Sequence, residues 1–191
     1  FTVNALAEDP IPKCDKLLLF GGGNVGYPPA AAIRAKAFES GIPCWLLPQS
    51  VIRHEDLKCE KMFFRESVSR DIIGDGEIAP DLALGFDFPE ADVKKNGSVT
   101  FLRKNGGSVH HHVKHAIRID PDAFCHTPED YWGFVDQFEE ITTDRLHLAI
   151  CALGTKTKAT LLPINYHKNL AMYEEWLAPL GCHWKNLVVG Y

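Results

Sequence analysis

The stretch LLLFGGGNVG, residues 17–26, indicates the fold class of this chain more clearly than any other segment. A short apolar run that ends in glycines is typical of a buried parallel strand followed by a tight loop. Pro28 and Pro29 suit the first turn of a helix, which we expect over residues 30–40. The segment therefore predicts the strand–loop–helix unit of an α/β fold.

Strands and helices are expected to alternate after this unit. The next expected elements are strands at residues 44–47, 61–65 and 81–84, and a short helix at residues 67–74. The strand at 44–47 is expected to stop at Pro48, because proline interrupts the hydrogen bonding of a sheet. This βαβαβ alternation predicts a Rossmann-like parallel sheet.

A second lobe is expected after residues 86–98, whose proline, glycine and mixed charge are typical of a linker. We therefore place an N-terminal Rossmann-like lobe in residues 1–90 and a C-terminal one in residues 91–191. The elements expected in the second lobe are strands at 98–103, 116–119 and 159–162, and helices at 131–141, from 143 or 144 to 153, and at 170–177.

The composition is that of an ordinary globular protein, with 191 residues of which 46% are hydrophobic and 24% are charged. The net charge of -5 makes nucleic acid an unexpected partner. The apolar runs are shorter than the roughly 20 residues of a membrane span, so we expect none. The first residues look like a cut or processed start and not a signal peptide. The cytoplasm is therefore the default compartment, the secretory lumen stays open, and the oligomeric state is not predicted.

The cysteines and histidines do not have the spacing of a metal site. Six cysteines are dispersed without a Cys-x-x-Cys pair, and we expect them to be reduced core residues. His110, His111, His112 and His115 could form a metal set only on a helix, but they follow glycines and are expected in a loop. We therefore expect no bound metal.

Gly21, Gly23 and Gly26 satisfy G-x-G-x-x-G directly after the first expected strand, where a loop can hold a phosphate or a sugar. A tight turn that serves only strand-to-helix packing explains the same glycines equally well. A dinucleotide site would also need an acidic residue at the end of the next strand, but that strand ends in PQS, residues 48–50. Dinucleotide binding is therefore the less favoured use of the loop.

The segment TTDRLH, residues 142–147, is the more informative one. If Thr143 or Asp144 caps a helix, Arg145 and His147 lie in its first turn, where free N–H groups and the helix dipole favour an anion. Arginine offers a planar fork to a carboxylate or phosphate, and histidine exchanges a proton near neutral pH. The competing interpretation is a local ion pair of Asp144 with Arg145 above a packed His147.

Three further arginines, Arg65, Arg70 and Arg103, come at or just after expected strand ends. Open α/β sheets bind their ligands at that edge. Convergence of these side chains would suit a substrate with more than one negative group, although each is also a common surface residue.

Five segments occur in a characteristic order: LLLFGGGNVG at 17–26, LLPQS at 46–50, RES at 65–67, APDLA at 79–83 and TDRLH at 143–147. In this order they resemble the motifs of the polysaccharide pyruvyl transferases. The resemblance implies a two-lobed, glycosyltransferase-B-like fold, here with a shortened N-terminal lobe. It also implies transfer of a pyruvyl group from phosphoenolpyruvate to two hydroxyls of one sugar. The expected partners are then phosphoenolpyruvate and a glycan acceptor, with no cofactor beyond this donor.

The resemblance also implies roles for individual residues. His147 would be the catalytic acid or base with Arg145 beside it, and Arg65, Arg145 and Leu146 would line the donor site. Arg103 joins the donor-binding set because it follows a strand end. The loop residues expected near the substrate are Gly22, Gly23, Asn24, Gln49 and Ser50.

Two departures from the family pattern support a second hypothesis. Tyr27 follows Gly26 where the family has Gly-Asp, and Asn105 stands where it has an acidic residue after Arg-Lys. These replacements suit a non-catalytic glycan-binding protein of the same fold. A dinucleotide-binding oxidoreductase, based on the glycine loop, is the third hypothesis.

Overall fold

A computed structural model of the chain describes residues 10–11, 13–20, 25–89, 94–104, 107–118 and 120–187. The chain divides into two compact units, Phe1–Asp81 and Leu82–Tyr191. The expected boundary at residue 90 stays a prediction, because residues 90–93 lie outside the described residues.

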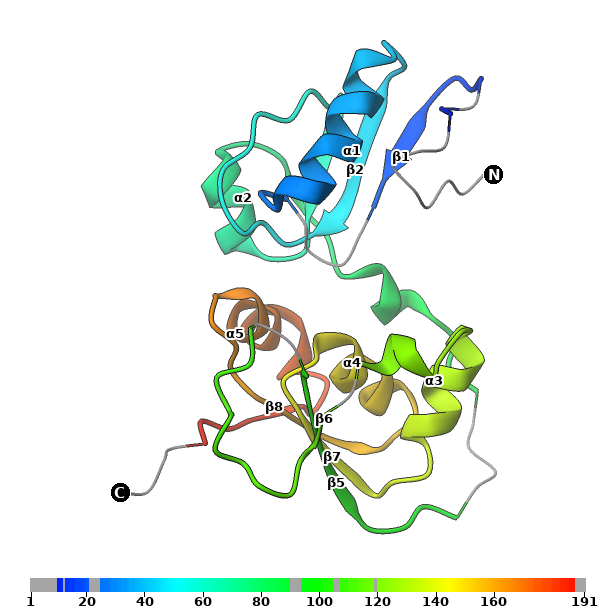
Figure 1. Cartoon of the computed structure of the whole chain (residues 1–191), viewed down its shortest axis with the longest axis vertical. Helices are drawn as coiled ribbons and strands as arrows, with labels where there is room; N and C mark the ends of the chain where they lie inside the picture. Colours follow the sequence, from blue (N-terminus) through cyan, green and yellow to red (C-terminus); the bar gives the residue numbers. More distant parts are fainter. Residues whose placement is uncertain are drawn as a thin grey trace. The chain divides into compact units, whose positions relative to one another are not determined.

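The first unit is a parallel four-stranded sheet in the order β1-β2-β3-β4. Figure 1 shows its strands β1 and β2 side by side. Its elements are β1 (Leu17–Leu19), α1 (Pro28–Glu39), β2 (Cys44–Gln49), β3 (Lys61–Phe64), α2 (Ser67–Ile73) and β4 (Glu77–Ile78). Val25, Leu46, Val51 and Phe64 form its fully buried core. β1 is an edge strand of this sheet. Its Leu18 is 39% exposed because only β2 pairs with it.

We expected the second strand to stop at Pro48, but β2 continues through this residue to Gln49. Leu46 pairs with Met62 and Gln49 with Phe64, so β2 uses one residue more than β3 over the same length. Such a bulge leaves one residue unpaired and thereby tolerates a proline inside a sheet.

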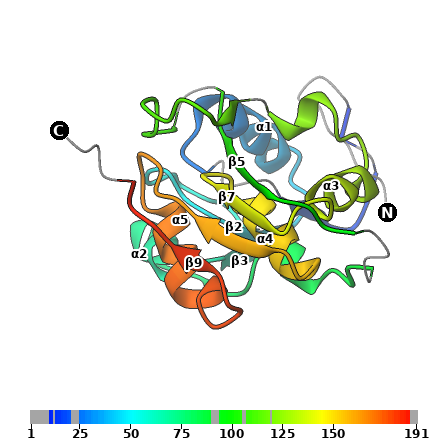
Figure 2. The same cartoon turned by 90° about the horizontal axis from the view of Figure 1, so that it is seen from below.

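The second unit is a parallel five-stranded sheet in the order β6-β5-β7-β8-β9 (Figure 2). Its strands are β5 (Ser98–Leu102), β6 (Ile117–Arg118), β7 (Glu140–Thr143), β8 (Lys158–Leu161) and β9 (His183–Trp184). Its helices are η1 (Leu82–Gly85), η2 (Pro121–Ala123), α3 (Pro128–Val135), α4 (Leu146–Gly154), α5 (Lys168–Met172) and the π-helical turn η3 (Tyr173–Leu177). Two parallel sheets with connecting helices confirm the predicted α/β class and its Rossmann-like character.

The strand order places the helices of the second unit. The connections from β6 to β7, β7 to β8 and β8 to β9 all move in one direction across the sheet. Right-handed crossovers then put α3, α4 and α5 on the same face. The core of this unit includes Phe101, Ile141, Leu148, Ile150 and Leu161, and α4 lies at its centre.

The structure corrects the type of one expected element and the length of another. The strand expected at 81–84 is the short helix η1, and the parallel strand that pairs with β3 is β4, a few residues earlier. The helix expected at 131–141 ends at Val135. Phe138 nevertheless packs on Phe134 with ring centroids 5.5 Å apart, so the apolar pattern continues into a turn and then into β7.

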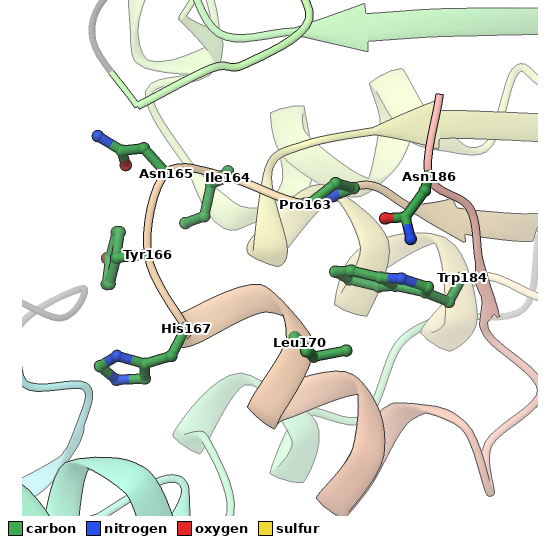
Figure 3. A pocket seen from close by; sticks show the side chains of 8 residues that line it. All are labelled: Pro163, Ile164, Asn165, Tyr166, His167, Leu170, Trp184 and Asn186. Atoms are coloured by element: carbon green, nitrogen blue, oxygen red, sulfur yellow. The ribbon is translucent and has the colours of Figure 1, made fainter. Parts of the chain in front are cut away.

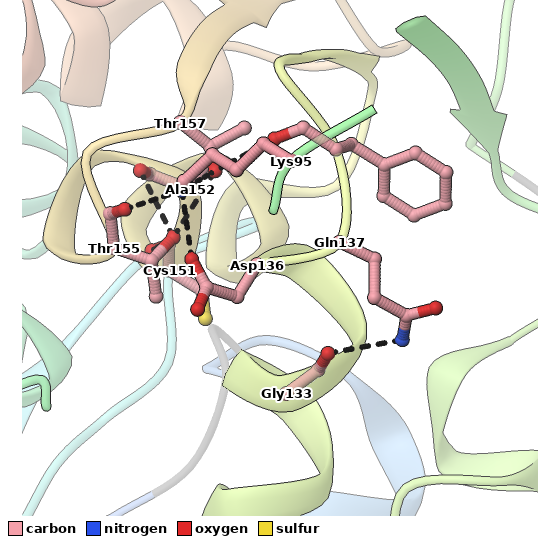
Figure 4. A network of polar contacts seen from close by, with 9 residues as sticks. Lys95, Gly133, Asp136, Gln137, Cys151, Ala152, Thr155 and Thr157 are labelled. Atoms are coloured by element: carbon pink, nitrogen blue, oxygen red, sulfur yellow. Dashed lines mark hydrogen bonds and ion pairs between the residues drawn. The ribbon is translucent and has the colours of Figure 1, made fainter. Parts of the chain in front are cut away.

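A polar network around Lys95 connects three segments of the second unit (Figure 4). Lys95 Nζ lies 2.7 Å from Asp136 Oδ1 and donates to the carbonyl oxygen of Thr155 at 2.6 Å and to Thr157 Oγ1 at 2.7 Å. The network joins the segment before β5 to the end of α3 and to the turn between α4 and β8.

None of the six cysteines forms a disulfide bond in the part of the chain that the structure describes. Cys44, Cys151 and Cys182 are buried as expected, whereas Cys14 is exposed and is not a core residue. Burial raises the pKa of Cys151 to about 12 and that of Cys182 to about 11, so these thiols are unreactive near neutral pH. Among the described helices, none is both long and apolar enough to cross a membrane.

Candidate active site

Four charged residues lie at the carboxyl edge of the second sheet. Arg103 follows β5, Asp120 comes shortly after β6, and Asp144 and Arg145 follow β7. Because these strands are parallel, their carboxyl ends lie at one edge, which is where open α/β sheets bind ligands.

Asp144 joins the strand ends at this edge. Its side chain is fully buried, and Oδ1 accepts a hydrogen bond of 2.9 Å from the backbone N–H of Arg103. The side-chain amide of Asn169 donates to the carbonyl oxygens of Asp144 and Leu162, both at 2.9 Å. Asp144 therefore holds β5 beside β7, and Asn169 holds β7 beside β8.

Arg145 is the N-cap residue of α4, so the helix begins at Leu146, one residue later than a cap at Asp144 would give. Its backbone N–H donates to Thr143 Oγ1 at 3.0 Å, and its guanidinium forms an ion pair with Asp120. The competing interpretation, a local pair of Asp144 with Arg145, is therefore not what the structure shows.

The two arginines at this edge retain hydrogen-bonding capacity. Nε of Arg103 and Nε of Arg145 are both buried without a hydrogen-bond partner among the described residues. Burial, and then the neighbouring charge of Arg103, lowers the pKa of Arg145 to about 10, which leaves its guanidinium charged at neutral pH. Two cationic forks next to a helix N-terminus form a site suited to an anion.

Leu146 and His147 take opposite directions from the start of α4. Leu146 is only 3% exposed and belongs to the core, whereas His147 is exposed. The structure therefore brings Arg103 and Arg145 to one edge, places Leu146 beneath them in the core, and leaves the His147 imidazole accessible.

His147 lines a hollow of about 380 Å³ between α3, α4 and the segment after η1, which we call the His147 hollow. Its lining consists of Ala83, Phe86, Phe88, Cys125, His126, Thr127, Pro128, Tyr131, Trp132, His147, Ile150 and Cys151. The rings of Phe86, Phe88 and Trp132 contact one another at centroid distances of 6.0–6.3 Å. These aromatic residues could not be predicted from the sequence, because they surround His147 only after folding.

A second hollow, which we call the Trp184 hollow, is lined by the segment that follows β8 and by the end of β9 (Figure 3). Its lining consists of Pro163, Ile164, Asn165, Tyr166, His167, Leu170, Trp184 and Asn186. Figure 3 shows the Trp184 ring near Leu170, with Tyr166 and His167 on the loop before α5.

In the first unit, Arg65 is held in a buried ion pair. It is 1% exposed and donates to Ser50 Oγ at 2.7 Å and to Asp81 Oδ2 at 2.5 Å. Gln49 and Ser50 are also buried. The other expected loop residues, Gly21 to Asn24, lie outside the described residues.

Gly26 ends the glycine-rich loop and is fixed by contacts that the sequence pattern does not reveal. Its N–H donates to Glu55 Oε2 at 2.8 Å, and Arg53 Nε donates to its carbonyl oxygen at 2.7 Å. Arg34 of α1 holds the same carboxylate with bonds of 2.7 and 2.6 Å. Gly26 has a φ of +82°, and a Cβ there would lie 2.5 Å from the carbonyl oxygen of Arg53. This glycine is therefore required by the packing of the turn.

The histidine-rich segment is a loop, as expected. His110 is buried, and its Nε2 lies 2.9 Å from the carbonyl oxygen of Pro163. Within the described ranges, no group of three or more His, Cys, Asp or Glu side chains is arranged to hold a metal ion.

The polysaccharide pyruvyl transferase family model matches residues 4–166, and the chain belongs to this family. In fold, the chain is similar to the crystal structure of a functionally uncharacterised protein from Klebsiella pneumoniae subsp. pneumoniae NTUH-K2044. The TM-score is 0.63 at 17% identity, over 91% of this chain and 75% of that one. No curated protein matches the chain.

Proposed function

We propose that the protein transfers the pyruvyl group of phosphoenolpyruvate to two hydroxyls of a glycan sugar and forms a cyclic ketal. Membership of the polysaccharide pyruvyl transferase family supports the reaction class. The observation that carries the proposal is an exposed His147 two residues after Arg145. The buried Nε of Arg145 has no hydrogen-bond partner among the described residues.

Phosphoenolpyruvate carries a carboxylate and a phosphate, and the carboxyl edge of the second sheet suits both. Arg145 and Arg103 each present a planar cation, and the N-terminus of α4 adds the positive end of its dipole. Asp120 now pairs with Arg145, and the donor anion would compete with this carboxylate. Leu146 supports the site from the core, and Arg65, Gln49 and Ser50 remain proposed donor-side residues of the first unit.

The reaction needs one proton to be added and two to be removed. A proton added to the methylene carbon of the donor makes the methyl group and leaves an oxocarbenium-like centre at C2. The first sugar hydroxyl attacks C2 and loses its proton, the C2–O bond to phosphate breaks, and the second hydroxyl closes the ring and loses its proton. One of these protons replaces the one used at the methylene, and the other leaves on hydrogen phosphate. His147 would exchange them, while the arginines stabilise the leaving phosphate.

Replacement of the imidazole tests this assignment. His147→Asn should lower the turnover of pyruvyl transfer by about 10²–10⁴-fold, since it removes acid–base exchange from an exposed side chain without disturbing the core. The measurement is phosphate release from phosphoenolpyruvate in the presence of hexopyranosides, with mass spectrometry of the acceptor.

The matched control is His126→Asn, a second exposed histidine that lines the same hollow. It should leave kcat close to that of the wild type, because His126 is not the proposed acid–base group. Turnover of His147→Asn near that of the wild type would remove His147 from the mechanism.

A further inference from the structure

We infer that the His147 hollow binds the sugar ring of the acceptor, with the aromatic residues Phe86, Tyr131 and Trp132 against the face of that ring. The inference rests on the proposed function, because it places the second substrate beside the proposed acid–base group. Nothing in the family match assigns residues to the acceptor.

The chemistry of the lining suits a neutral, partly apolar ligand. The residues of this hollow include no Lys, Arg, Asp or Glu, in contrast to the cationic edge formed by Arg103 and Arg145. A pyranose ring has an apolar C–H face and a rim of hydroxyls. Aromatic rings provide broad contact for such a face, and a few polar groups fix the orientation of a ligand in a mostly apolar pocket.

The aromatic residues are accessible to a ligand. Phe86 is 51% exposed, and Tyr131 and Trp132 are only partly buried. Phe88 packs so closely on Gly154 that an added Cβ would overlap its ring. This contact anchors the segment that carries Phe86. The volume of about 380 Å³ lies within the roughly 300–1,000 Å³ that is usual for small-molecule sites.

The position of the hollow suits attack on the donor. Pro128, Tyr131 and Trp132 come from the first turns of α3, and His147 comes from the first turn of α4. Both helices begin on the side of the sheet where Arg145 lies, since each runs back from the carboxyl edge. A sugar in the hollow therefore has its hydroxyls close to the His147 imidazole. The donor anion would be bound by Arg145, which precedes His147 by two residues.

Polar groups at the rim match hydroxyl recognition. His126 is exposed, and Thr127 is fixed because its Oγ1 accepts a hydrogen bond from the backbone N–H of Asp130 at 3.2 Å. Both side chains can exchange hydrogen bonds with sugar hydroxyls. The hollow thus combines an aromatic surface, neutral polar groups and the proposed acid–base residue.

The test compares the two hollows of the same unit. Phe86→Ser removes an exposed ring of the His147 hollow, and Trp184→Leu removes the large ring of the Trp184 hollow as a matched control. Steady-state kinetics are measured with phosphoenolpyruvate and the best hexopyranoside acceptor. We expect Phe86→Ser to raise the Michaelis constant of the acceptor roughly tenfold and to leave that of phosphoenolpyruvate unchanged. Trp184→Leu should leave both constants unchanged.

An unchanged acceptor constant in Phe86→Ser, or the larger effect in Trp184→Leu, would overturn the inference. Circular dichroism melting of both variants checks that the fold is kept.

Binding of the acceptor alone separates this inference from the proposed function. Methyl hexopyranosides are titrated into the wild type and Phe86→Ser while tryptophan fluorescence is recorded, since Trp132 lies in the hollow. Saturable binding that weakens in Phe86→Ser supports the hollow even if the wild type transfers no pyruvyl group, in which case the proposed function fails by itself. Absence of binding, or equal binding to both proteins, contradicts the hollow.

Discussion

Arg145 and His147 are separated by one residue, yet the structure directs them to different surroundings. Arg145 is extended at the N-cap and pairs with Asp120, while His147 is in the first turn of α4 and faces the aromatic hollow. The core residue Leu146 between them fixes the start of the helix. In the proposed function, this one turn of chain would bind the donor anion on one side and the acceptor sugar on the other.

Part of this arrangement could be predicted from the sequence. The TDRLH segment predicts a helix start at these residues, and α4 begins at Leu146 with Arg145 as its N-cap. The anion site that we expect there stays a prediction. The pairing with Asp120 could not be predicted, since the two residues are 25 positions apart and meet only when β6 and β7 both flank β5.

Glu55 provides a prediction for a single residue. Burial alone would raise the pKa of its carboxyl, but hydrogen bonds from Arg34 and from the Gly26 N–H lower it below the ordinary value. A depressed pKa contributes stability above the unfolded pKa of about 4.3, and this contribution is lost as pH falls through the folded pKa. Glu55→Gln should therefore lower the free energy of unfolding by about 1–2 kcal/mol at pH 7, and by less as pH falls below about 4.

Urea unfolding of wild type and variant at several pH values between 7 and 3 measures this difference. The exposed Glu39→Gln at the end of α1 is the charge control, and it should change stability little at pH 7. A wild-type–variant difference that stays constant down to pH 3 would show that the carboxylate does not hold Gly26 as described.

At the scale of elements, alternating apolar segments and turn residues predict most strands and helices in the correct order. One expected strand, at 81–84, is instead the short helix η1, and the other errors lie at element ends. Pro48 falls in a bulge of β2 that is defined by the pairing with β3, and the helix expected to reach residue 141 ends at Val135. In both places tertiary pairing decides the boundary, and a local pattern contains no information about the partner strand.

Replacement of Lys95 measures how much the polar network between elements contributes to stability. Its side chain is 22% exposed and that of Asp136 is 11% exposed, so removal of the ammonium leaves a largely buried carboxylate without its cation. Lys95→Met should lower the free energy of unfolding by about 2 kcal/mol, less than the 3–5 kcal/mol of a fully buried pair because water still reaches the lysine.

Lys94→Met is the neighbouring control, since Lys94 is exposed. Chemical denaturation of both variants gives the comparison. Equal stability of the two variants would mean that the network shown in Figure 4 contributes nothing measurable.

At the scale of the whole molecule, the predicted fold class is confirmed by two parallel sheets, one in each unit. The predicted family is confirmed as well, because its motifs span both units and the family model covers residues 4–166. The aromatic hollow was not predicted, because its lining comes from segments up to 68 positions apart that have no shared sequence pattern.

The most direct test of the account is thermal unfolding of the protein with phosphoenolpyruvate, repeated on Arg145→Ala and on His147→Asn. A ligand that binds only the native state adds about 2.7 kcal/mol at 100 times its dissociation constant, so Tm must rise. We expect Tm to rise in the wild type and in His147→Asn, the rise to be lost in Arg145→Ala, and an equal concentration of sulfate not to reproduce it. No rise in the wild type, or the same rise in Arg145→Ala, would contradict it.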